Sequence, residues 1–191
     1  MKLRALLAAA FVLTFGAAVA HESAASEIGL NAGVAMPFGD FGDVAGTGFF
    51  GGATYCYHVN DQYGIGGDLN YQSYGKKDFG LGNYTYSLIN IGANGKYFFK
   101  LKDSKEMPYA KVGLGIYNLR AKTEFTYPGL GTISATGSDS KFGISLGLGA
   151  DWKMGEKNSW GAEVLYHNIA ADPSATMATV ALRYNWMMSS K

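Results

Sequence analysis

The sequence is poor in cysteine, proline and charge. It has a single cysteine and four prolines in 191 residues, only 16% of the residues are charged, and the formal net charge is +1. One cysteine cannot form a disulfide within the chain, which excludes a disulfide-stabilised scaffold. Four prolines exclude a collagen-like or proline-rich chain, and the balanced charge argues against nucleic acid as a partner.

Helical periodicity is also missing, and apolar residues instead recur at every second position. In the segment "ATVALRYNW", Ala178, Val180, Leu182, Tyr184 and Trp186 alternate with smaller or polar residues. This period predicts a β-strand with two different faces. Eight such segments follow one another, at residues 27–36, 48–59, 62–73, 83–99, 108–122, 141–153, 158–168 and 178–186.

The N-terminus has the features of a secretory signal peptide. Lys2 and Arg4 precede the apolar run "ALLAAAFVLTFGAA", and Ala18-Val19-Ala20 forms an A-x-A cleavage site before His21. We therefore expect residues 1–20 to be removed, leaving one domain over residues 21–191. Without Lys2 and Arg4 the 16 basic residues become 14 against 15 acidic ones, a net charge of −1.

The polar faces of the predicted strands are rich in glycine and sparsely charged, with charges of both signs. This composition is typical of a narrow interior, where facing side chains must fit and pair, rather than of a water-exposed surface. Aromatic residues gather near the strand ends, as an interfacial girdle requires, and the connections tend to alternate between long and short. The apolar faces are therefore predicted to contact lipid.

Several segments resemble the small outer-membrane β-barrel domain family of Gram-negative bacteria, which includes OmpA/OmpX-type and opacity-type barrels. They are "GVAMPFGDFGDVAGTGFFGGATYCYHV", "PYAKVGLGIY", "WGAEVLYHNI" and the final "VALRYNW", and the resemblance spans about residues 27–186. It implies an all-β fold, an eight-stranded antiparallel up-and-down transmembrane β-barrel with meander topology. It also implies export to the cell outer membrane, with lipid, lipopolysaccharide and the outer-membrane assembly machinery as partners.

Six charged residues on the polar faces are expected to form a mixed-charge network inside the barrel: Asp68, Lys96, Lys111, Asp151, Glu163 and Arg183. Glu163 and Arg183 lie on neighbouring strands and are expected to meet. The network is interpreted as a structural plug, because an eight-stranded barrel is just wide enough for side chains to fill it. The alternative is a gate or selectivity filter.

No catalytic, cofactor or metal site is expected. A lipid A-modifying enzyme would need a histidine base beside a serine nucleophile, but no serine follows His167 two residues later, and Ser174 lies across a turn. Cys56 and His58 share a strand face, and two ligands do not make a metal site. The glycine-rich segments lie within strands and lack the strand-to-helix context of a phosphate loop.

One long connection, "TEFTYPGLGTISATGSDS", carries Phe125, Tyr127 and Leu130 among small polar residues, and it is predicted to be a surface-contact loop.

The expected function is a structural or surface-interaction role, adhesin-like, in a monomeric barrel without catalytic activity. Its partner would be a host or neighbouring-cell surface. The alternatives are a narrow passive pore for small solutes or ions and, third, a lipid A-modifying enzyme.

Overall fold

The computed structural model describes residues 26–79, 82–99, 101, 105–127, 131–172 and 174–188. The expected signal peptide and its cleavage site between Ala20 and His21 lie outside these residues. None of the described helical residues forms a helix long and apolar enough to cross a membrane.

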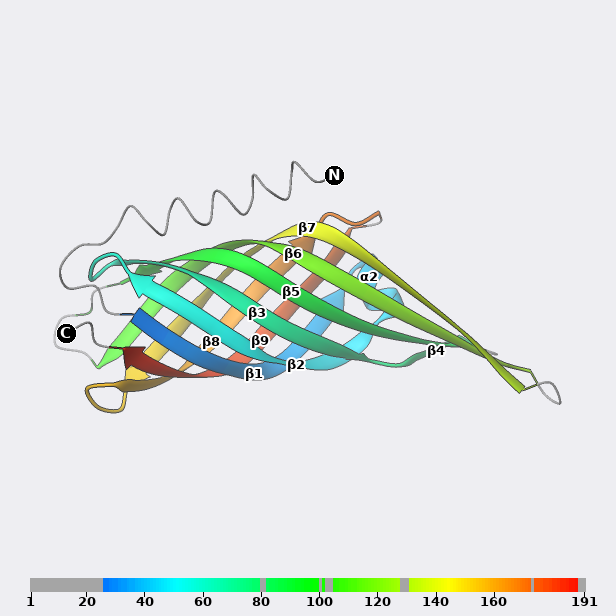
Figure 1. Cartoon of the computed structure of the whole chain (residues 1–191), viewed down its shortest axis with the longest axis horizontal. Coiled ribbons are helices and arrows are strands. Elements are labelled where there is room, and N and C mark those ends of the chain that lie inside the picture. The colour runs from blue at the N-terminus through cyan, green and yellow to red at the C-terminus, as the bar shows by residue number, and fades with distance from the viewer. Residues whose placement is uncertain are drawn as a thin grey trace.

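Eight long strands form one closed antiparallel sheet, as expected (Figure 1). The strands are β1 (Ser26–Phe38), β2 (Gly46–His58), β3 (Tyr63–Gly75), β5 (Gly82–Phe98), β6 (Glu106–Tyr127), β7 (Gly131–Lys153), β8 (Asn158–Ile169) and β9 (Ala175–Met188). A short strand, β4 (Lys77–Phe79), pairs with the start of β5, and one helical turn, α2 (Asp40–Val44), connects β1 and β2. Each long strand pairs with its neighbour in the chain, which is the predicted meander.

The barrel closes between its first and last strands. The β1–β9 ladder runs from Ser26↔Met188 to Phe38↔Thr176 without a break in register. Closure leaves no sheet edge along the barrel wall, which is the condition for a β-structure to cross hydrocarbon, because lipid offers no hydrogen-bond partner to an open edge. The predicted pairing of the C-terminal strand with the first strand is confirmed.

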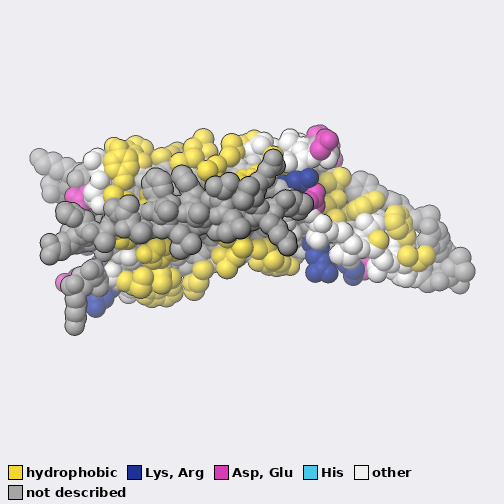
Figure 2. Space-filling model, turned by 45° about the horizontal axis from the view of Figure 1, so that its top comes forward, with side chains coloured by type: hydrophobic (Ala, Val, Ile, Leu, Met, Phe, Trp, Pro, Cys, Tyr) yellow, Lys and Arg dark blue, Asp and Glu magenta, His cyan; other side chains and the backbone are white. Residues whose placement is uncertain are grey.

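The two faces of the wall differ as the alternation predicts, and Figure 2 shows hydrophobic side chains over the outer face. Leu30, Leu146 and Leu182 point outward with 53%, 62% and 66% of their surface exposed, whereas the intervening polar side chains are buried. From Phe142 to Trp152 the outward positions of β7 are apolar. Ten residues span about 33 Å along a strand, or about 25 Å along the membrane normal at a tilt of ~40°. That is the height of the apolar band of an outer-membrane barrel.

The two ends of the barrel are unlike each other. At one end, called the turn end, β1 begins, β9 ends and short turns join β2 to β3 and β7 to β8 (Figure 1). At the other end β5, β6 and β7 continue beyond the barrel as a narrow sheet. We call this sheet the extension; it comprises β4 and residues 82–87, 118–127 and 131–141.

The extension corrects the sequence prediction for this region. Residues 123–140 were expected to form a long loop, but β6 and β7 stay paired as far as Tyr127↔Gly131. Alternating threonine, serine and small residues suit a β-ladder, yet they offer no apolar–polar contrast from which a strand could be predicted. Phe125 therefore lies in a strand, Tyr127 ends that strand, and Leu130 lies outside the described residues.

Candidate functional site

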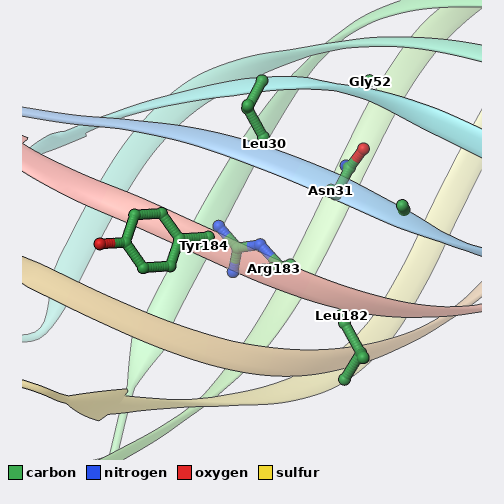
Figure 3. Close-up of a pocket in the computed structure, with 7 residues that line it drawn as sticks. Leu30, Asn31, Gly52, Leu182, Arg183 and Tyr184 are labelled. Carbon is green, nitrogen blue, oxygen red and sulfur yellow. The ribbon is translucent and has the colours of Figure 1, made fainter.

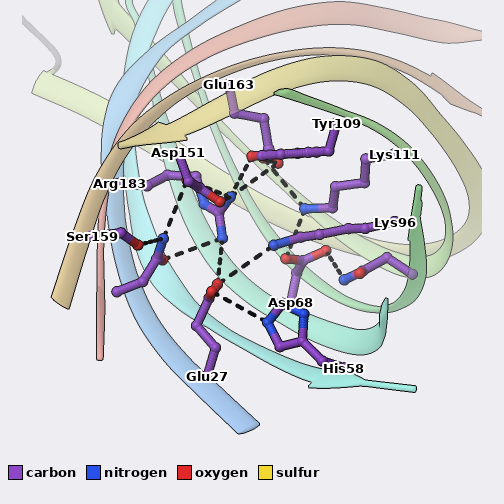
Figure 4. A network of polar contacts seen from close by, with 12 residues as sticks. Glu27, His58, Asp68, Lys96, Tyr109, Lys111, Asp151, Ser159, Glu163 and Arg183 are labelled. Carbon is purple, nitrogen blue, oxygen red and sulfur yellow. Dashed lines mark hydrogen bonds and ion pairs between the residues drawn. The ribbon is translucent and has the colours of Figure 1, made fainter. Parts of the chain in front are cut away.

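An ion-pair network fills the interior of the barrel toward the turn end (Figure 4). Its centre is Arg183 on β9, whose guanidinium lies 3.4 Å from a carboxylate oxygen of Glu27 and 3.4 Å from one of Asp151. A third carboxylate, that of Glu163, lies 3.9 Å away. The Arg183 side chain is fully enclosed, and these carboxylates offset the cost of burying its positive charge.

Two lysines extend the network across the lumen. Lys111 on β6 contacts Asp68 at 3.0 Å and Glu163 at 3.3 Å. Lys96 on β5 lies 3.6 Å from Glu27, with its ammonium 4.9 Å from the ring centroid of Tyr109. All six charged residues expected in the interior are thus brought into one connected cluster. The expected contact between Glu163 and Arg183, at 3.9 Å, is longer than the Arg183–Asp151 contact at 3.4 Å and the Lys111–Glu163 contact at 3.3 Å.

Two central members of the network were not predicted from the sequence. Glu27 joins Lys96, Arg183 and His58, the last at 3.7 Å. Tyr109 accepts a hydrogen bond from Arg183 and donates one of 2.9 Å to Glu163. Both follow the polar face of their strands, so the alternation could have identified them. Tyr109 lies across Gly149, the residue opposite it on β7, where a Cβ atom would collide with the ring.

A second, less charged layer lies nearer the extension. His167 contacts the hydroxyl of Tyr117 at 3.0 Å through Nδ1 and that of Thr179 at 3.1 Å through Nε2. The arrangement looks like a base beside a hydroxyl nucleophile, but His167 and Thr179 are only 5% and 3% exposed. Ser174, the serine considered from the sequence, lies in the exposed connection between β8 and β9. A lipid or solute at the outer wall would not reach this buried pair.

The helical turn α2 caps the lumen at the extension end. Phe41 points into the barrel and meets Tyr74 and Tyr86 edge-on, with ring centroids 5.2 and 5.8 Å apart. Lys77 donates a 2.7 Å hydrogen bond to the carbonyl of Gly42 and so ties the turn to the start of β4. Below Phe41 lies a cluster of buried apolar side chains: Ala35, Ala45, Tyr74, Leu88, Tyr117, Ile169, Ala175 and Met177. Side chains therefore occupy the lumen at both levels.

The extension reverses the polarity of the barrel wall. Its inner face, which continues the lumen, carries Tyr84, Leu119, Phe125 and Ile133, with Asp139 and Lys141 nearer the barrel. Ile133 lies directly opposite Phe125, with 64% of its surface exposed. The outer face of the extension carries serine, threonine and charged residues. Such a face suits water rather than hydrocarbon, so the extension stands outside the membrane.

One long edge of the extension has no neighbouring strand. β8 pairs with β7 only from Gly143 onward, so within the described residues no strand lies beside positions 133–141 of β7. Asp139 and Lys141 form a 2.9 Å ion pair there, and this hydrogen bond holds the pKa of Asp139 below its usual value. From residue 133 to 138 the edge carries no lysine or proline, the residues that usually prevent another strand from pairing.

The outer wall carries a shallow groove between β1 and β9 (Figure 3). Leu30, Ala32, Gly52, Leu182 and Tyr184 line it. Asn31 and Arg183 also line it, but both are buried, so the exposed side chains are Leu30, Leu182 and Tyr184 of the lipid-facing belt, and the groove accommodates hydrocarbon. Within the described ranges no three His, Cys, Asp or Glu side chains are arranged to hold a metal ion.

Comparison with known proteins agrees with this architecture. The chain matches the family model of the outer membrane protein beta-barrel domain over residues 5–185. A search of curated protein sequences finds no match. Among solved structures, neisserial surface protein A is similar with a TM-score of 0.62 and 17% identity, over 86% of this chain and 99% of that one.

Two further structures share the fold. Ail, the attachment invasion locus protein of Yersinia pestis, has a TM-score of 0.55 and 16% identity, over 88% of this chain and 100% of its own. A major outer membrane protein from Thermus thermophilus has a TM-score of 0.69 and 10% identity, over 87% and 100%. At these identities the likeness concerns the fold alone. The chain belongs to the outer membrane protein β-barrel domain family and is a protein of the outer membrane.

Proposed function

We propose that the protein is a non-conducting, non-catalytic barrel that anchors a surface-contact element, the extension, outside the cell. The observation that carries this proposal is the extension itself, with its exposed β7 edge and with Phe125 and Ile133 on its inner face. In this family short turns face the periplasm and longer elements face outward, so the turn end is periplasmic and the extension is extracellular.

The filled lumen supports an anchor rather than a passive pore. The Arg183 network closes the periplasmic half, and the apolar cluster below Phe41 closes the extracellular half. A solute would have to displace ion pairs that are buried, and separating them would leave uncompensated charges. We infer that the six charged residues named from the sequence serve as a structural plug.

The buried position of His167 argues against a lipid A-modifying enzyme. Such an enzyme acts on a substrate in the outer leaflet, so its base and nucleophile must open to the outer wall. The His167 ring nitrogens are instead occupied by Tyr117 and Thr179 inside the barrel.

The extension supports contact with a host or neighbouring-cell surface. A strand edge offers main-chain donors and acceptors, to which an extended segment of another protein can add. Phe125 and Ile133 supply apolar contacts beside that edge. The closed barrel needs no second copy to complete it, so we infer a monomer. β9 would be the strand recognised by the assembly machinery.

Two measurements test this proposal. In planar bilayers the purified protein should show no ion conductance, and steady single-channel currents would favour the pore. Cells displaying the protein should be retained on epithelial layers, or on one another, more than cells without it. Ile133→Lys should abolish that retention, while Asn83→Lys, on the polar outer face of β5 and away from the β7 edge, should change it less. Equal retention of cells with and without the protein would contradict a contact role.

A further inference from the structure

Between the ion-pair network and the apolar cluster lies a third level of the lumen, built from asparagine and glycine. On β1, Asn31 stands four residues from Glu27 of the network and four residues from Ala35 of the apolar cluster. The residue beside Asn31 on β2 is Gly52, and the residue beside Gly52 on β3 is Asn70. We call Asn31, Gly52 and Asn70 the amide row.

Both amides of the row turn toward the glycine between them. A Cβ atom on Gly52 would collide with Oδ1 of Asn70, so this oxygen lies over the glycine. Figure 3 shows the carboxamide of Asn31 directed toward β2, with its oxygen on the side of Gly52. The row therefore presents two amide oxygens to one place, which a residue without a side chain leaves open to them.

Neither oxygen has a hydrogen-bond donor among the described residues. Oδ1 of Asn31 and Oδ1 of Asn70 are both enclosed, and Asn31 as a whole is only 7% exposed. An enclosed amide oxygen without a donor costs free energy comparable to that of a lost hydrogen bond, and buried polar atoms in native proteins are therefore almost always paired. A donor belongs between the two amides.

The residues that flank the row indicate which kind of molecule supplies this donor. Arg183 is the partner of Asn31 on β9, and Asn90 is the partner of Asn70 on β5. Nε of Arg183 and Nδ2 of Asn90 are enclosed donors for which the described part of the chain offers no acceptor. A metal cation could not accept from these donors, and an anion could not donate to the two oxygens. Water does both, and a buried water typically makes about three such hydrogen bonds.

The spacing of the strands suits one bridging water. Neighbouring strands are about 4.8 Å apart, so Asn31 and Asn70 lie roughly 10 Å apart across Gly52. Two amides that lean toward each other close part of this gap. Two hydrogen bonds of about 2.8 Å, made by a single water molecule, can span the rest.

We propose that the amide row is a binding site for ordered water, in which one molecule donates hydrogen bonds to Oδ1 of Asn31 and Oδ1 of Asn70 at once. This water ties β1 to β3 across Gly52, and further waters accept hydrogen bonds from Arg183 and Asn90. The ion-pair network closes the site on one side and the apolar cluster closes it on the other, so the waters exchange slowly with the solvent. The site is independent of the proposed contact surface, which lies in the extension.

The test is solution NMR of the full protein in lipid nanodiscs, with water itself as the probe. The reporter is the Hα atom of Gly52 that points into the lumen, because this proton does not exchange with solvent. Wild-type protein should show a nuclear Overhauser cross-peak between this proton and water, and the double change Asn31→Leu, Asn70→Leu should abolish it. The matched control is Asn83→Leu, Asn118→Leu, which removes two amides from the outer face of the extension and should leave the cross-peak unchanged.

Unfolding in urea provides a second measurement. Because one water serves both oxygens, Asn31→Leu and Asn70→Leu should be non-additive. The double variant should lose less stability than the two single variants lose together. Strict additivity would show that no bridge joins the two amides.

The remaining outcomes also decide the proposal. A wild-type spectrum without the cross-peak would show that no water is held there, and a cross-peak that survives in the double variant would place the water elsewhere. If the Gly52 resonances shift when sodium is replaced by N-methylglucamine, the occupant is a cation. Broadening of these resonances by a gadolinium chelate would show a lumen open to solvent. If the double variant does not fold, as judged by its circular dichroism, Asn70→Leu alone decides, and an unweakened cross-peak would overturn the site.

Discussion

The hydroxyl of Tyr109 donates a 2.9 Å hydrogen bond to the carboxylate of Glu163, two strands away across Gly149. The same hydroxyl accepts a hydrogen bond from Arg183, so one phenol joins the acidic and basic parts of the network. This link makes the interior a connected structure rather than a set of separate pairs. The stability lost when a member of the network is substituted should therefore depend on the contacts which that member makes.

Arg183→Ala should destabilise the barrel by about 3–5 kcal/mol, because it leaves buried carboxylates without their cation. Double-mutant cycles from urea unfolding in lipid vesicles should give a larger coupling with Asp151 than with Glu163. Asp151 lies closer to Arg183, at 3.4 Å against 3.9 Å, and Glu163 also has Lys111 at 3.3 Å. Equal couplings, or none, would mean that the carboxylates are not organised around Arg183.

Gly149→Ala should cost roughly 1–3 kcal/mol, since a methyl group there collides with the Tyr109 ring. Gly155→Ala is the matched control, because nothing lies within 4 Å of its Cβ position, and it should stay within about 0.5 kcal/mol of wild type. The cost at Gly149 should shrink in a Tyr109→Leu background. If the two changes are strictly additive, contact with the ring is not the cause.

Two residues of β7 with similar exposure test where the membrane ends. Leu146 and Ile133 are 62% and 64% exposed, but Leu146 lies in the apolar belt and Ile133 in the extension. Leu146→Arg should cost about 2–4 kcal/mol in lipid vesicles, whereas Ile133→Arg should cost less than about 1 kcal/mol. Equal costs would place both residues in the same medium and contradict the assigned boundary.

Phe41→Ala should release α2 without unfolding the barrel. Loss of the buried ring costs roughly 3 kcal/mol or more, which raises the open population of the turn about a hundredfold. Cleavage before Asp40 or Asp43 by an Asp-specific protease should accelerate accordingly. Phe49→Ala, which removes a ring that is 75% exposed on the outer wall, should not accelerate it. An unchanged cleavage rate in Phe41→Ala would mean that the ring does not hold the turn.

The alternation of the sequence was sufficient to predict the wall of the barrel. Leu182 and Arg183 fall on opposite faces, as expected, and the last strand pairs with the first over its full length. Period 2 assigns each residue to one face, and a membrane-spanning sheet must close, so strand order follows from chain order. Neither step requires knowledge of the side-chain packing.

Contacts across the lumen could not be predicted in the same way. The ladder partner of Arg183 on β1 is Asn31, yet the Arg183 guanidinium turns toward the turn end and reaches Glu27, four residues away. The direction in which the Arg183 side chain turns depends on the offset between strands and on the space that glycines leave beside it. Neither can be predicted from the alternation of the sequence. The length of the extension was missed because Ser134, Ala135 and Thr136 do not differ enough in polarity to produce a periodic signal.

β6 and β7 run unbroken from the turn end of the barrel to the tip of the extension, paired from Glu106↔Trp152 to Tyr127↔Gly131. A force that pulls on the tip along the strands would draw β6 and β7 in the same direction, so it would load their hydrogen bonds to β5 and β8 in shear rather than opening them one by one. The tip has no hinge within the described strands at which it could yield. Tension applied to the tip would be carried into the membrane-embedded wall, where β8 and β5 share the load.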